Sequence, residues 1–145
     1  MAKAKAVKYP IIYEMRRGTW NDYWRVAIYK NNAALKKGLK AEGIVDATPD
    51  TLALVHSTAS YTKKLEWGDF TSSMFATLFL SLDNMGTEIL CHESVHIGMA
   101  HERFINRFKM EYGDQCGTNE ERLAYYIGSV MRGLVETLRE NGHIE

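Results

Sequence analysis

The sequence predicts an α+β domain in which short strands come first and two long helices come last, packed together on one sheet. Up to position 82 the chain contains short apolar or alternating segments separated by turn residues, as strands do. After position 87 the apolar residues recur at helical spacing instead. No repeat, low-complexity tract or linker divides the 145 residues, so we expect one domain over 1–145 with a single core.

The N-terminal half is expected to supply the sheet and one short helix. The expected strands are 9–13, 24–30, 51–57, 61–67 and 75–82, of which the last is rich in large apolar residues. A short helix is expected over 33–42, after Asn31 and Asn32, with Gly43 closing it.

The C-terminal half is expected to form two long helices, over 87–112 and 119–140. Gly113 follows the first helix at the position of a C-terminal cap, and Asn141 with Gly142 ends the second. In the second helix one face carries the bulky apolar residues Leu123, Ile127, Val130, Met131, Leu134 and Leu138.

Composition excludes several classes of function. The chain has 18 basic and 18 acidic side chains and a formal net charge of zero, which argues against nucleic acid or an anionic membrane as a partner. No apolar run is long enough for a membrane-spanning helix or a signal peptide. Two cysteines are too few for a disulfide framework. We therefore expect a cytoplasmic protein with reduced thiols.

The most informative segment is His92-Glu-Ser-Val-His96, a match to H-E-x-x-H inside the first long helix. Residues four apart on a helix lie on the same face, so both imidazoles can reach one Zn²⁺. Glu93 lies on the neighbouring side, where it can take a proton from a zinc-activated water. The alternative is that both histidines are ordinary helix residues.

A catalytic zinc site needs a third protein ligand. His101 comes one position too early for the third histidine of the extended motif, so we expect it at the surface or the rim of the site. The acidic pair Glu120-Glu121, at the start of the second long helix, offers a better donor. We favour Glu121, with Glu120 as the alternative, because Glu121 shares its face with small residues where two helices can approach closely.

Glu121 has a competing interpretation. The segment Thr118-Asn-Glu-Glu121 fits a capping box, in which the threonine caps the helix and the glutamate bonds back to it. A capping glutamate would be partly solvated and would not hold a metal. Tyr125 lies one turn after Glu121 and is our candidate for stabilising a developing oxyanion.

With these motifs the chain resembles zincin metallopeptidases of the gluzincin type, in which H-E-x-x-H is followed by a glutamate on the next helix. Glu121 and Ala124 supply the E-x-x-A pattern of that second helix. The segment NEERLAYYIG (119–128) also resembles small zincin-like proteins encoded by phages. The resemblance covers roughly 75–138.

The resemblance implies a zinc ion held by His92, His96 and Glu121, with Glu93 as general base. It further implies that the strand 75–82 runs along the cleft, where an edge strand pairs with an extended peptide. The expected function is thus a zinc-dependent hydrolase, specifically a peptidase with a peptide or protein substrate. The alternative is a non-catalytic, zinc-stabilised module that binds or inhibits a partner protein.

Overall fold

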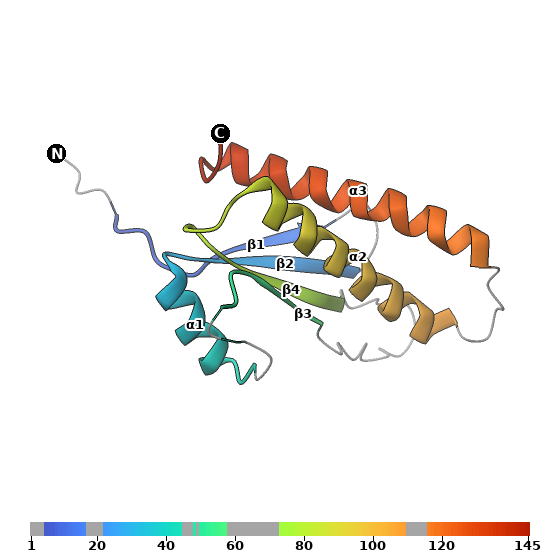
Figure 1. Cartoon of the computed structure of the whole chain (residues 1–145), viewed down its shortest axis with the longest axis horizontal. Helices are drawn as coiled ribbons and strands as arrows, with labels where there is room; N and C mark the ends of the chain where they lie inside the picture. Colours follow the sequence, from blue (N-terminus) through green and yellow to red (C-terminus); the bar gives the residue numbers. More distant parts are fainter. Residues whose placement is uncertain (1–4, 17–21, 45–47, 49, 58–72, 110–115) are drawn as a thin grey trace, which may run out of the picture.

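The structure is a computed structural model that describes residues 5–16, 22–44, 48, 50–57, 73–109 and 116–145, without the side chains at 73, 105–109 and 116–120 (Figure 1). Over these residues the protein forms one sheet and three helices, which confirms the predicted α+β class. The strands are β1 (Ile11–Arg16), β2 (Asp22–Tyr29), β3 (Leu54–Ser57) and β4 (Ser73–Ser81). The helices are α1 (Asn32–Ala41), α2 (Thr87–Lys109) and α3 (Cys116–Glu140). The strand expected over 61–67 lies outside the described residues.

The strand order is β1-β2-β4-β3, with β2 and β4 parallel and both outer pairs antiparallel. The expectation that the strand 75–82 forms the sheet edge beside the cleft is therefore wrong, because β4 lies between β2 and β3. Its side chains explain this position, because Leu78 and Leu80 are buried on one face while Phe79 is buried on the other. The short strand β3 forms the open edge next to β4.

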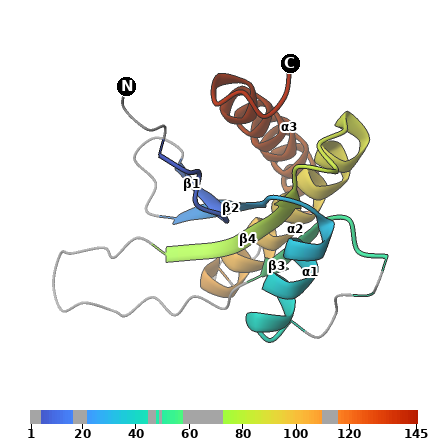
Figure 2. The same ribbon diagram turned by 90° about the vertical axis from the view of Figure 1, so that its left-hand side faces the viewer.

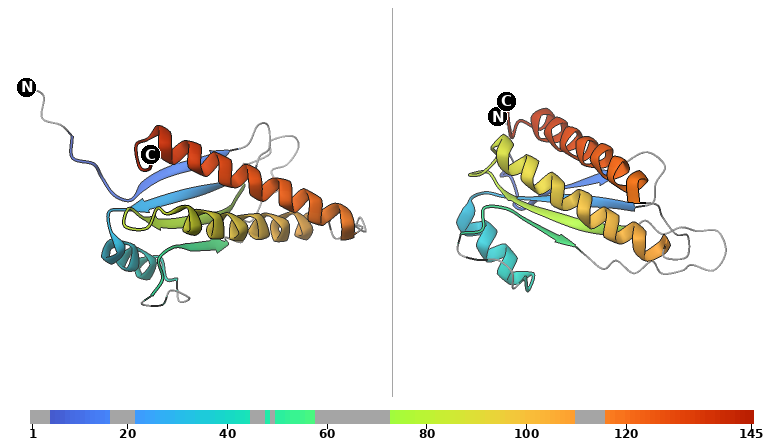
Figure 3. Two further views of the ribbon diagram at one scale, coloured as in Figure 1. Left: turned by 45° about the horizontal axis from the view of Figure 1, so that its top comes forward. Right: turned by 45° about the vertical axis from the view of Figure 1, so that its right-hand side comes forward.

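The two long helices lie side by side on one face of the sheet, as predicted (Figure 3). Leu90 and Ile97 of α2 and Leu134 of α3 pack there with inward side chains of β2 and β4. The opposite face carries a second, smaller cluster, in which α1 covers Ala27 and Phe79 through Leu35 and Leu39. In both Figure 1 and Figure 2, α3 lies toward the β1 side of the sheet and α1 toward the β3 side.

The ends of α1 follow the sequence signals. The side chain of Asn31 accepts a hydrogen bond of 2.8 Å from the Ala34 N–H, which satisfies a free amide of the first turn. Gly43 follows the helix with φ of 71°, the left-handed conformation that glycine adopts at low cost.

Among the described residues, no helix is long and apolar enough to cross a bilayer.

Candidate metal centre

His92 and His96 lie together on the solvent-facing side of α2. Their Nε2 atoms are 3.1 Å apart and their ring centroids 4.8 Å apart. Two nitrogen ligands of one tetrahedral zinc, each bound at about 2.0–2.1 Å, lie about 3.3 Å apart. The two imidazoles therefore converge at nearly the separation that a shared zinc ion requires, and with 67% of the His92 side chain exposed the approach is open.

Glu93 lies beside this pair but points into the protein. Only 8% of its side chain is exposed, and its Oε1 is 4.0 Å from the Nε2 of His92. Burial raises the pKa of this carboxyl, and the neighbouring His92 and His96 oppose that shift. No hydrogen bond reaches the carboxylate from the part of the chain that the structure describes. A buried carboxylate without such a partner, beside two converging imidazoles, is available to exchange a proton with a ligand.

The face of α2 that carries the histidines is linked to the edge strand β3 by Arg103. Arg103 follows His96 by seven positions (103 − 96), which returns it to the same face of the helix two turns later. Its Nη2 donates a hydrogen bond of 3.2 Å to the Oγ of Ser57, the last residue of β3. The helix face that carries the histidines is thus fixed alongside the edge strand.

Glu121 is not brought to the histidine pair. Its side chain is exposed on α3, and α3 packs against the side of α2 that carries Ser94 and Gly98. Residues two apart on a helix lie on nearly opposite sides, so this contact side faces away from His96. The predicted triad of His92, His96 and Glu121 is therefore not assembled.

The face of α3 chosen for Glu121 explains the difference. The small residues that share the face of Glu121 are Ala124 and Gly128; the close helix crossing expected there is not found, because both are exposed. The close approach comes instead from α2: a Cβ added to Gly98 would lie 2.4 Å from Cγ1 of Ile127 and 3.4 Å from Cδ1 of Leu123. The small residue that permits the contact is thus on the other helix, opposite the bulky face of α3.

The two alternatives for this region have different outcomes. Helix α3 begins at Cys116, so the backbone of Thr118 lies inside the helix rather than at the N-cap position that the capping box requires. The side chain of Glu120, the alternative ligand, lies outside the described residues.

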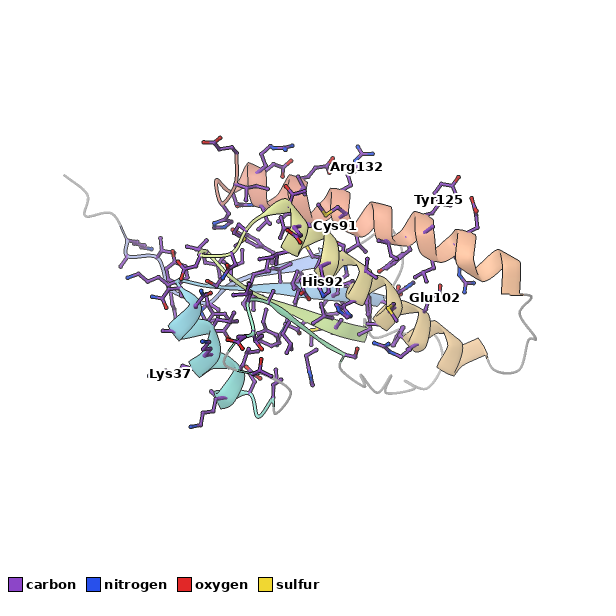
Figure 4. All side chains as sticks on the ribbon, viewed as in Figure 1. Lys37, Cys91, His92, Glu102, Tyr125 and Arg132 are labelled. Atoms are coloured by element: carbon purple, nitrogen blue, oxygen red, sulfur yellow. The ribbon has the colours of Figure 1, made fainter. Side chains whose placement is uncertain are left out.

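Tyr125, the candidate for oxyanion stabilisation, is remote from the pair. Its side chain is on the outer side of α3 and the residue is 72% exposed. Figure 4 shows it, like Arg132, pointing away from α2 and His92. Because it follows the exposed Glu121 by one turn, the same choice of helix face misplaced both residues.

His101 is an interior residue, so the prediction of a surface or rim position is wrong. Its Nε2 lies 2.6 Å from Oδ2 of Asp22, and only 12% of its side chain is exposed. The imidazole ring stacks on the ring of Tyr126 of α3, with the ring centroids 3.9 Å apart. Its centroid is 5.0 Å from that of the Phe75 ring of β4. The hydrogen bond from His101 holds the pKa of the Asp22 carboxyl below its usual value, although burial opposes the shift.

Sequence reasoning missed this Asp22–His101 pair. The two residues are 79 positions apart, and no local pattern connects them. The edge position of β3 was missed for a similar reason, since strand order depends on contacts between distant segments.

Within the described residues, no three histidine, cysteine or acidic side chains are grouped closely enough to hold a metal ion together. The residues present fit zinc at two positions, His92 and His96, and Glu121 in its observed place does not add a third. Comparison of the chain with protein-family models, with curated proteins and with solved structures finds no match.

Proposed function

We propose that this protein is a zinc-dependent hydrolase and that its substrate is a peptide. One observation carries the proposal: the Nε2 atoms of His92 and His96 converge to 3.1 Å on an exposed helix face, directly beside the buried carboxylate of Glu93. Two histidine donors four residues apart, beside a carboxylate that acts as a base and does not ligate, are the H-E-x-x-H part of a zinc hydrolase site; the third protein ligand of such a site must come from elsewhere.

His92 and His96 would hold the zinc ion. Zinc bound there supplies a Lewis acid that polarises a carbonyl and lowers the pKa of a water molecule toward about 7. Glu93 accepts a proton from the attacking water and delivers it to the leaving amine. Burial raises the pKa of its carboxyl, which makes it a stronger base than an exposed glutamate and suits both halves of this transfer.

An extended peptide is the substrate class that the surroundings favour. Among the strands that the structure describes, the edge strand β3 has one hydrogen-bonding side without a partner, and such edges pair with added strands. Arg103 ties this edge to the histidine-bearing face of α2 through Ser57. A chain paired along β3 would therefore pass beside His96 and Glu93.

The competing function, a zinc-stabilised binding module, is less well supported. A structural zinc site joins elements that would otherwise separate, and its loss unfolds the domain. Here both histidines are on one helix and exposed, while the core is built from other residues. The metal would contribute little to holding these elements together.

A cytoplasmic location is part of the proposal. Cys91, next to the histidine pair, is exposed and not in a disulfide. An exposed free thiol is typical of a reducing compartment.

The test compares the zinc-loaded wild type with Glu93→Gln on a library of random-sequence peptides. We expect Glu93→Gln to bind zinc as the wild type does and to lose hydrolysis by about 10²-fold or more, since it cannot accept a proton. The matched control is Glu88→Gln, an exposed glutamate on the same helix, which should leave the rate unchanged. Undiminished hydrolysis by Glu93→Gln would remove Glu93 as the base.

A further inference from the structure

Arg103 carries a charge that the described structure does not neutralise. Its guanidinium donates to the neutral hydroxyl of Ser57, and no carboxylate among the described residues pairs with it. The adjacent Glu102 is already engaged, because both of its oxygens accept hydrogen bonds from Arg122 of α3, at 3.2 Å and 3.0 Å. Arg103 is therefore an exposed cation with donors left for a ligand.

The position of this cation relative to the histidine pair is fixed by helix geometry. Arg103 lies seven positions after His96, a rise of about 10.5 Å along one face of α2. An extended peptide rises about 3.3 Å per residue, so three residues span this distance. The hydrogen bond to Ser57 keeps the guanidinium at the edge strand rather than free in solvent.

We propose that Arg103 selects peptides that carry a carboxylate about three residues from the bond that is cut. This inference rests on the proposed hydrolase function and names its substrate class. Guanidinium groups bind carboxylates through paired, charge-assisted hydrogen bonds, which gives both affinity and direction. The carboxylate has two sources with the same chemistry: an acidic side chain, or the free C-terminus of the peptide. Arg103 is a specificity-determining residue in this scheme and takes no part in bond cleavage.

The experiment uses the zinc-loaded full chain and one peptide that the wild type cleaves, prepared in four forms. Two forms carry glutamate or glutamine three residues from the cut bond, and two end there with a free carboxylate or an amide. We expect the wild type to prefer at least one carboxylate form by up to about fivefold in kcat/KM, the upper end of the effect of one exposed ion pair. The form that is preferred identifies the source.

Two variants connect the preference to Arg103. Arg103→Gln should lose the preference for the carboxylate, measured as the ratio of kcat/KM between the charged and uncharged forms. Arg103→Glu should instead prefer a fifth form of the peptide, with lysine in place of the glutamate, which a merely structural role would not produce. The control is Arg132→Gln on α3, whose exposed side chain is already paired with Glu136.

The outcomes separate the two proposals. Cleavage of all four peptides at equal rates, or an undiminished preference in Arg103→Gln, would overturn the role of Arg103 and leave the hydrolase standing. Failure of the wild type to cleave any peptide of the random-sequence library would reject the hydrolase, and this inference with it.

Discussion

Helix α2 carries two histidine sites that differ in what surrounds them. His101 is enclosed by aromatic rings, and its Nε2 is bonded to the carboxylate of Asp22. His92 and His96 are exposed, and among the described residues each has only the other at hydrogen-bond distance. At the first site, the hydrogen bond to Asp22 and the ring contact with Tyr126 fix α2 against β2 and α3. At the second site two imidazole nitrogens lie 3.1 Å apart on an exposed helix face, close to the separation that two ligands of one zinc ion have.

The contrast shows that the role of each histidine depends on what its face of α2 meets, which the spacing of the histidines alone does not reveal. All three histidines lie within ten residues of α2 (101 − 92 + 1). Only His101 is turned toward the layer where the sheet and α3 meet. Their roles can be separated by experiments that affect one site and spare the other.

The largest effect on stability is expected from His101→Ala. The substitution removes a hydrogen bond to a charged group and leaves the Asp22 carboxylate largely buried without it, at a cost of about 2–3 kcal/mol in the free energy of unfolding. His96→Ala is the matched control and should change stability by less than about 0.5 kcal/mol, because that side chain is exposed. Denaturant unfolding measures both. Equal losses would show that the two sites do not differ as described.

A smaller effect is expected when the pH is lowered. The pKa of Asp22 is lower in the folded protein than its ordinary value of 3.8, so ionised Asp22 stabilises the fold above that pH. The contribution is lost as the pH falls through the lower, folded-state pKa. The wild type should therefore lose stability more steeply below about pH 4 than Asp22→Asn. Parallel pH dependences in thermal unfolding of the two proteins would contradict a role for the hydrogen bond between Asp22 and His101.

The smallest effect is expected from Glu121→Ala. Because Glu121 is exposed and α3 contacts the other side of α2, we expect this variant to retain zinc and to change stability by less than about 0.5 kcal/mol. Elemental analysis of the purified variant measures whether zinc is retained. Loss of the metal would mean that the glutamate reaches the histidines in the zinc-bound protein, as the gluzincin resemblance implies.

The sequence was sufficient to predict the parts of this fold that depend on local periodicity. The apolar spacing from Leu123 to Leu138 predicts the face of α3 that packs inward, and Val130, Leu134 and Leu138 are buried there. The pairing of His92 with His96 also follows from helix geometry alone. These features need no knowledge of distant contacts.

The remaining errors come from contacts between distant segments. The position of Glu121 relative to the histidines depends on which side of α2 meets α3, and this was decided by Gly98, a residue that local spacing did not single out. The partner of His101 lies in β2, and the edge strand is set by the pairing of β3 with β4. Composition and periodicity carry no information about such contacts.

The central claim is that His92 and His96 bind a metal ion, and its most direct test is the zinc content of three purified proteins after zinc loading and dialysis. We expect about one zinc ion per chain in the wild type and in His101→Ala, and almost none in His96→Ala, since one imidazole alone holds the ion too weakly. Zinc retained by His96→Ala, or absent from the wild type, would contradict the claim.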